Sequence, residues 1–164
     1  INRQMRNLNH FKQKKEIYYR YKEGFNGLPV SMNPIPDKCE PNYWLSCLLI
    51  DSEAMSKQVR GEREVLYLPE HGKSCPTEIL EAMNSIHAEG RPIWKPMHAQ
   101  PIYRLNPYVV KNGNGRAGSN AYLAGETPDN GMDIFHRGLC LPSDNKMTQE
   151  QQDRIIEVVR ACFA

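Results

Sequence analysis

The sequence predicts an α+β fold in which a small, mostly antiparallel sheet packs against helices. Apolar residues recur every three or four positions in the segments 1–25, 77–88 and 148–163, which is typical of amphipathic helices. Two short apolar runs, 43–50 and 138–141, favour strands. Along the chain the order is helix, strand, helix, irregular segment, strand, helix, which indicates a small sheet covered by helices.

The first predicted helix is long and starts with the chain. Its apolar stripe consists of Ile1, Met5, Leu8, Phe11, Tyr18, Tyr21 and Phe25. Gly24 and Gly27 offer stops for this helix. Residues 28–42 hold four prolines, so this stretch is expected to be an extended linker or an edge strand.

A buried strand is predicted next, followed by a surface excursion. Residues 43–50 form an apolar run without a breaker, and Tyr43 and Trp44 at its start point to opposite faces. Residues 52–64 are polar and charged, which indicates a surface segment. Val65–Leu68 is a candidate short strand.

The second predicted helix covers Thr77–Ala88. Pro76 precedes it, a residue suited to the first turn because its missing N–H has no helical partner there. Gly90 is expected to end the helix. Residues 107–131 hold five glycines and are expected to form a long loop.

The C-terminal part predicts a helical turn at Met132–His136, a strand at Gly138–Leu141 and a final helix. Thr148 is placed to cap that helix, with Gln151 at the spacing of a capping box. The apolar stripe of the final helix is Ile155, Ile156, Val159, Cys162 and Phe163.

Composition predicts one globular domain over residues 1–164. The chain is 40% hydrophobic and 24% charged, with a net charge of +2, so no nucleic-acid partner is expected. No apolar run approaches the roughly 20 residues of a membrane span, and the start does not resemble a signal peptide. The five cysteines contain no C-x-x-C pair and the five histidines have no ligand spacing, which favours free thiols, no metal site and a cytoplasmic location.

The segment Arg91–Pro101, with the sequence RPIWKPMHAQP, combines cations, an indole and an imidazole on a backbone stiffened by three prolines. Such a rigid and irregular segment, rich in Trp, Arg and His, suits contact with a ligand better than filling a core. Two further motifs are NYWLSCLLID at residues 42–51 and RGLCLPS at residues 137–143.

These three motifs, in this order, resemble the DegT/DnrJ/EryC1/StrS family of pyridoxal-phosphate-dependent sugar aminotransferases, and the resemblance covers roughly the whole chain. It implies the C-terminal small domain of a type I aminotransferase fold. In the family the cofactor is held by a lysine in a larger N-terminal domain, and none of the ten lysines here lies in a segment like that motif. The chain alone is therefore expected to be inactive, with no covalent cofactor and no catalytic residue of its own.

The resemblance also implies the reaction and partners of a complete enzyme. An amino group passes from glutamate to a nucleotide-linked keto sugar, with pyridoxal phosphate as cofactor, and the enzyme is a homodimer. Among family members the chain looks most similar to transaminases that form UDP-4-amino-4,6-dideoxy-N-acetylhexosamines for surface glycans. The alternative is a non-catalytic nucleotide-sugar-binding or interaction module of the same fold.

His98 is the first candidate substrate-binding residue. The resemblance places the histidine of the KP-x-H pattern at the mouth of the active site, where an imidazole can orient hydroxyls or a diphosphate. A packed or surface histidine is the alternative. Trp94 is either a wall of the sugar pocket or a core residue, because indole suits both.

Four further candidates carry cationic or aromatic groups. Arg91 and Lys95 can pair with a diphosphate or a carboxylate, or instead with a nearby glutamate. Tyr43 or its neighbour Trp44 is expected to approach the site while the other joins the core. Arg116 lies in a polar, glycine-rich stretch that either closes over phosphates or is a plain solvated loop.

Overall fold

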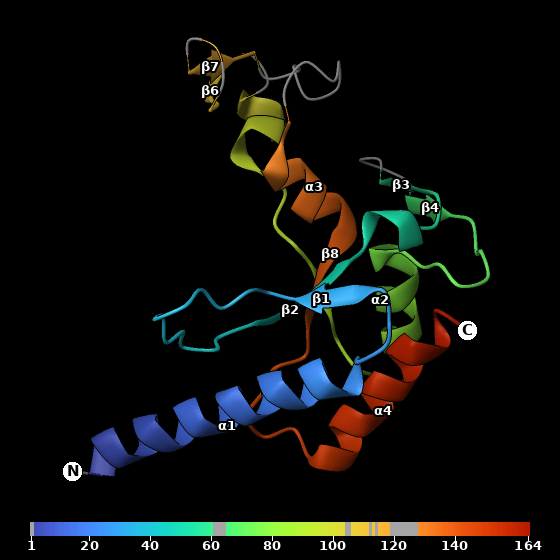
Figure 1. The fold of residues 1–164 in the computed structure, drawn as a ribbon. Coiled ribbons are helices and arrows are strands. Elements are labelled where there is room, and N and C mark those ends of the chain that lie inside the picture. The colour runs from blue at the N-terminus through green and yellow to red at the C-terminus, as the bar shows by residue number, and fades with distance from the viewer. Residues whose placement is uncertain (1, 61–64, 104–105, 112, 114, 119–127) are drawn as a thin grey trace. The chain divides into compact units, whose positions relative to one another are not determined.

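A four-stranded antiparallel sheet organises the fold, and its strands come from distant parts of the sequence (Figure 1). Across the sheet the order is β1 (Val30–Met32), β2 (Ser46–Ile50), β8 (Gly138–Leu141) and β5 (Arg91–Pro92). Every neighbouring pair is antiparallel. This sheet, with the helices packed on it, confirms the predicted α+β class.

The computed structural model describes residues 2–60, 65–103, 106–111, 113, 115–118 and 128–164, and the side chains of the first helix from residue 9 onward. The chain divides into two compact units, one of residues 1–92 and 137–164 and the other of residues 93–136. The four-stranded sheet belongs to the first unit. That residues 1–164 act as one domain stays a prediction.

The first helix, α1 (Asn2–Gly24), ends at the predicted glycine. Its buried side chains are Ile17, Tyr18 and Tyr21, and Phe25 follows directly after the helix. A Cβ on Gly24 would meet the side chain of Ile156, so glycine permits the close approach of this helix end to the last helix. Ile1 lies outside the described residues.

Helix α4 (Gln149–Ala161) confirms the predicted capping box. The Thr148 hydroxyl accepts a hydrogen bond from the Gln151 backbone N–H, and the Gln151 side chain accepts one from the Thr148 N–H. Buried Gln152 donates from Nε2 to the Ile17 carbonyl at 2.7 Å, which ties α4 to α1. The two hydrogen bonds between Thr148 and Gln151 satisfy two backbone N–H groups at the start of the helix that have no helical partner.

Helix α2 (Pro76–Ser85) includes Pro76 as its first residue, one position before the predicted start at Thr77, and ends three residues before the predicted end at Ala88. The chain leaves the helix through Ile86 and through His87, whose φ of 60° is left-handed. At Gly90 a Cβ would collide with the side chains of Met83 and Leu80. This glycine therefore serves close packing against α2 rather than termination of the helix.

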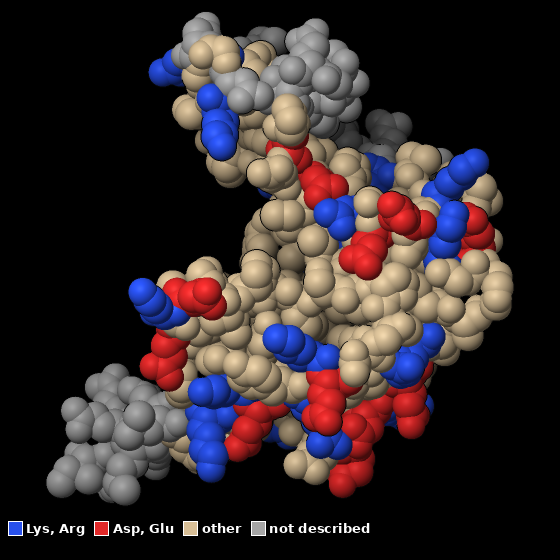
Figure 2. Space-filling view, in the orientation of Figure 1, with Lys and Arg blue, Asp and Glu red and all other residues tan. Residues whose placement is uncertain are grey.

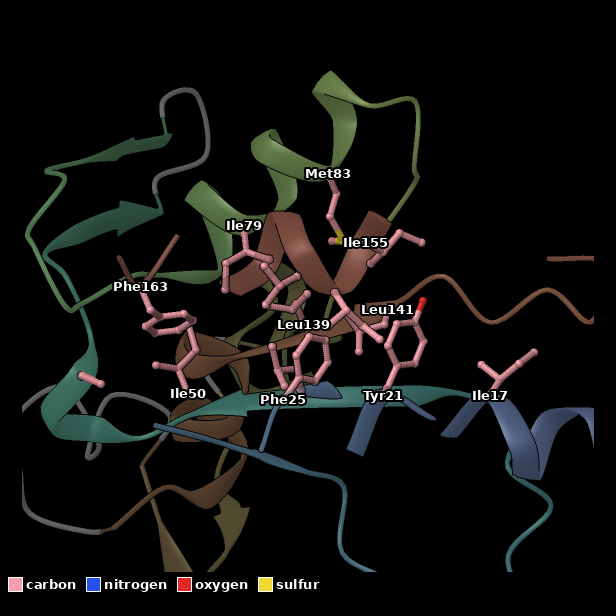
Figure 3. Close-up of a cluster of buried hydrophobic side chains, with 14 residues drawn as sticks. Ile17, Tyr21, Phe25, Ile50, Ile79, Met83, Leu139, Leu141, Ile155 and Phe163 are labelled. Carbon is pink, nitrogen blue, oxygen red and sulfur yellow. The ribbon is translucent and has the colours of Figure 1, made fainter. Parts of the chain in front are cut away.

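The hydrophobic core lies between one face of the sheet and the helices α1, α2 and α4. Figure 3 shows the side chains that meet there, among them Leu139 and Leu141 from β8. Burial alternates along β2, with Ser46, Leu48 and Ile50 buried. Strand β8 is buried at all four residues, as expected for a central strand.

Strand β2 begins at Ser46, so the predicted start at residue 43 is wrong. Tyr43 has a φ of 51°, which is left-handed, and a chain in that conformation cannot continue an extended strand. The side chains of Tyr43 and Trp44 nevertheless separate as expected, because Tyr43 is buried and Trp44 is exposed.

Strand β3 (Gln58–Arg60) lies in the predicted surface segment 52–64 and forms an antiparallel hairpin with β4 (Val65–Tyr67), which follows that segment. The candidate strand at Val65–Leu68 is confirmed, whereas its partner β3 was not predicted. A short 3-10 helix at Ser52–Ala54 precedes the hairpin.

The described residues of the second unit form short elements. The unit holds the 3-10 turns Met97–Ala99 and Pro101–Tyr103 and a hairpin of β6 (Tyr108–Val109) and β7 (Arg116–Ala117). Helix α3 (Asn130–Arg137) confirms the predicted helical turn and leads into β8. The hairpin lies within residues 107–131, where a long loop was predicted.

Charges of both signs are interspersed over the described part of the face in Figure 2. Arg20 of α1, for example, pairs with Asp153 of α4 at 2.7 Å between Nη2 and Oδ2. Among the described residues, no helix has both the length and the apolar character that crossing a membrane requires.

Truncating a central core residue should cost far more than truncating an exposed one of the same type. We expect Leu139→Ala, at a fully buried position, to lower the free energy of unfolding by about 2–5 kcal/mol. Leu66→Ala, on the exposed hairpin, should change it by less than about 0.5 kcal/mol. Denaturant titration measures both values, and equal costs would contradict the described core.

Candidate functional site

The segment Arg91–Pro101 has the irregular backbone that its prolines predict. It begins as the edge strand β5, with Arg91 opposite Cys140 in the register. Pro96 then stands in an extended conformation before the 3-10 turn Met97–Ala99. The Gln100 side chain donates from Nε2 to the Lys95 carbonyl at 3.1 Å, which holds this part of the segment in place. The first two residues belong to the first unit and the rest to the second.

His98 forms a three-part cluster with Asp129 and Tyr108, all within the second unit. The Nε2 atom of His98 hydrogen-bonds to the Oδ2 atom of Asp129. The rings of His98 and Tyr108 are stacked, with centroids 4.2 Å apart and planes inclined by 12°. The side chains of His98 and Asp129 are 15% and 7% exposed. The imidazole is therefore held from one edge and one face, which fixes its orientation.

Asp129 also forms the N-cap of α3. Its Oδ1 atom accepts a hydrogen bond from the Met132 backbone N–H at 3.0 Å. A carboxylate at a helix N-terminus satisfies an orphan donor and suits the positive end of the helix dipole. One side chain thus links the orientation of His98 to the start of α3.

A cavity of about 600 Å³ opens beside this cluster. Its lining includes Pro96, His98, Tyr108, Lys111 and Asp129. A Cβ on Gly131 would lie 3.0 Å from the Pro96 ring, so the start of α3 packs closely on the proline-rich segment. The cavity combines an aromatic ring, an imidazole, a carboxylate and an ammonium group, which is a set suited to hydroxylated and charged ligands.

The other candidates of the segment are exposed or half-buried. Trp94 is 65% exposed, so within the described residues it is not a core residue. Lys95 is half-buried. Arg91 pairs with Glu89 at 2.6 Å between Nη2 and Oε1, and both side chains are about three-quarters exposed. That surface ion pair is the alternative partner named for Arg91 from the sequence, and a pair so exposed contributes little to stability.

Tyr43 belongs to an aromatic cluster on α1. Its ring centroid lies 5.4 Å from that of Tyr18, 5.7 Å from that of Phe11 and 6.1 Å from that of Tyr19. A hydrogen bond with Tyr19, together with burial, raises the pKa of the Tyr43 phenol to about 12. The side chain is packed within the first unit.

Of the six predicted binding residues, all of them described, His98 alone lines the cavity beside the cluster. His98, Trp94, Lys95 and Arg116 share the second unit, with Arg116 exposed on β7. Arg91 and Tyr43 belong to the first unit. Sequence reasoning missed Asp129 and Tyr108, although an aspartate just before an amphipathic helix is an N-cap signal that applies to Asp129.

Several solved structures of aminotransferases, some of them named as sugar aminotransferases, have similar folds. A DegT DnrJ EryC1 StrS aminotransferase from Brucella abortus matches 94% of this chain with a TM-score of 0.60 and 14% identity, over 31% of its own length. Spr1654 from Streptococcus pneumoniae, named as a sugar aminotransferase, matches 94% with a TM-score of 0.65 and 16% identity, over 31% of its length. The chain therefore has the fold of a part of these aminotransferases, as the motifs predicted.

A sequence comparison also finds an aminotransferase. EpsN of Bacillus subtilis strain 168, named as a pyridoxal phosphate-dependent aminotransferase, is 29% identical over 152 residues, which are 92% of this chain and 31% of EpsN. The chain spans about a third of the length of the relatives it matches. No protein-family model matches the sequence.

Replacement of Asp129 tests its role as the N-cap of α3. Asp129→Ala removes the cap of α3, so we expect a stability loss of about 0.5–2 kcal/mol and faster hydrogen exchange at the Met132 amide. Asp129→Asn is the matched control because it keeps a side-chain oxygen that can accept the Met132 N–H. Amide exchange followed by NMR or mass spectrometry distinguishes the two. Unchanged exchange in the alanine variant would contradict the capping role.

Proposed function

We propose that this chain is the C-terminal small domain of a pyridoxal-phosphate-dependent aminotransferase that moves an amino group from glutamate to a nucleotide-linked keto sugar. The observation that carries the proposal is the similarity to EpsN over 92% of the chain, together with the fold shared with sugar aminotransferases. The large domain, a homodimeric state and a cytoplasmic location belong to the same proposal.

Two neighbours in the structural comparison support a sugar substrate. One is Helicobacter pylori PseC, described as an aminotransferase of pseudoaminic acid biosynthesis, with a TM-score of 0.59. Another is DesI in the presence of its TDP-sugar product, with a TM-score of 0.63. The motif resemblance further favours UDP-4-keto-6-deoxy-N-acetylhexosamine as substrate and surface glycan synthesis as the pathway.

None of the ten lysines, all of which are among the described residues, is buried within this chain by itself. A lysine that forms a Schiff base is activated by desolvation or by a neighbouring cation, and the described residues alone desolvate none of these side chains fully. We therefore place the cofactor lysine in the large domain, and assign this chain to the sugar side of the pocket.

The proposed work of the chain is to bind and orient the sugar. The imidazole of His98, held by Asp129 and Tyr108 beside the cavity, is the proposed contact for a sugar hydroxyl or a diphosphate. Exposed Trp94 offers an indole face to a sugar or a nucleobase. Arg91, Lys95 and Arg116 are the proposed cations for phosphate or carboxylate groups, and Tyr43 is a further proposed contact.

Replacement of His98 in the full-length enzyme tests this function. We expect His98→Ala to lower kcat/KM for the keto sugar by about 10- to 100-fold, because about 1.4 kcal/mol of lost binding or transition-state stabilisation is worth a factor of ten. His10→Ala, at an exposed position on α1, is the control and should keep wild-type constants. Melting curves check that both variants fold.

The outcomes separate the alternatives. Wild-type constants in a folded His98→Ala variant would make His98 a structural residue. A full-length protein that binds nucleotide sugars but transfers no amino group, even with pyridoxal phosphate and glutamate supplied, would instead be the non-catalytic module of the same fold.

A further inference from the structure

Two cysteines face each other on the central strands of the sheet. Cys47 on β2 and Cys140 on β8 are direct partners in the antiparallel register. Their Sγ atoms lie 3.8 Å apart. Leu139 and Leu141 of β8 enter the core, and side chains alternate along a strand, so the thiols lie on the opposite face of the sheet.

The backbone around Cys47 shows which type of cross-strand pair this is. Its N–H donates to Asn33 Oδ1 at 2.9 Å, and its carbonyl accepts from the Asn33 N–H at 2.9 Å. Both backbone groups therefore point away from β8, so Cys47 and Cys140 occupy a non-hydrogen-bonded position. In such pairs the Cα atoms are about 4.5 Å apart. That separation falls within the range of about 4.4–6.8 Å that a disulfide spans.

The two thiols are not equivalent. Cys47 is half-buried, whereas Cys140 is buried. The hydrogen bond between them lowers the pKa of the Cys47 thiol and raises the pKa of the Cys140 thiol. Cys47 is therefore both the more accessible group and the one whose thiolate is favoured, and thiolate is the reactive form of cysteine.

We propose that Cys47 and Cys140 form a reversible disulfide when the protein meets hydrogen peroxide. This oxidative modification site is independent of the proposed aminotransferase function. Disulfide formation requires the two sulfur atoms to approach from 3.8 Å to the bonded distance of about 2.05 Å.

The chemistry balances in two steps. The Cys47 thiolate attacks one oxygen of the peroxide and breaks the O–O bond, which leaves a sulfenic acid on Cys47 and a hydroxide that takes up a proton to become water. The Cys140 sulfur then attacks the Cys47 sulfur and expels hydroxide, which leaves as a second water with the Cys140 thiol proton. Two thiols lose two electrons in total, and the peroxide is reduced to two waters.

The cross-link would join strands that are far apart in the sequence. The two cysteines are separated by 93 positions, so the disulfide closes a long loop and restricts the unfolded chain. Oxidation should therefore raise the unfolding midpoint of the protein, and reduction with dithiothreitol should restore the original value.

Peptide mapping of the full-length protein tests the proposal. After mild peroxide treatment, alkylation of free thiols and digestion with trypsin, we expect the peptides of residues 39–57 and 138–146 to be joined, with the loss of two hydrogen atoms. The experiment is run in a Cys39→Ser background because Cys39, an exposed thiol, shares the first peptide with Cys47. Dithiothreitol should separate the two peptides.

Single variants assign the roles of the two sulfurs. Cys47→Ser and Cys140→Ser should each abolish the cross-link, whereas Cys162→Ser should leave it intact. In Cys140→Ser the sulfenic acid on Cys47 should persist and react with a cyclic diketone probe. In the wild-type protein, oxidation of the exposed Cys39 shows that the peroxide treatment was effective. The proposal is overturned if, under the same treatment, the two peptides stay separate and alkylated, or if Cys47 is joined to another cysteine.

Discussion

The pairing of β2 with β8 is the constraint on which the rest of the structure depends. It joins residues 46–49 to residues 138–141, and its partners Cys47 and Cys140 are 93 positions apart in the sequence. On one face the pair presents Leu48 and Leu139 to the helices, and on the other it sets Cys47 beside Cys140. A shift of the register by one residue would send the leucines out of the core and the thiols into it. Core packing and thiol chemistry therefore follow from the same alignment.

In the candidate site, the single carboxylate of Asp129 makes two structural contacts. Asp129 caps α3 through Oδ1 and holds His98 through Oδ2. The helix that it caps continues directly into β8. The hydrogen bonds that orient the imidazole lie within the second unit. A rigidly held imidazole beside a cavity is what a sugar-positioning role requires.

Local chemistry explains which features could be predicted from the sequence. The Thr148–Gln151 capping box, the proline at the start of α2 and the apolar strand β8 depend on neighbouring residues, and all three are present. The start of β2 was predicted wrongly because Tyr43, whose ring packs against Tyr18 of α1, has a left-handed φ that the apolar pattern of residues 43–50 does not reveal.

The contact between His98 and Asp129 spans 31 positions, and no local pattern marks such a pair. For Asp129, the sequence carries only the local signal of a helix N-cap, and this signal does not identify His98 as its partner.

The central claim is that this chain holds the sugar while a lysine elsewhere holds the cofactor. Borohydride reduction of the full-length protein with pyridoxal phosphate, followed by peptide mapping, tests it most directly. The account predicts a single stable pyridoxyl adduct on a lysine outside residues 1–164. An adduct on one of the ten lysines of this chain would contradict it.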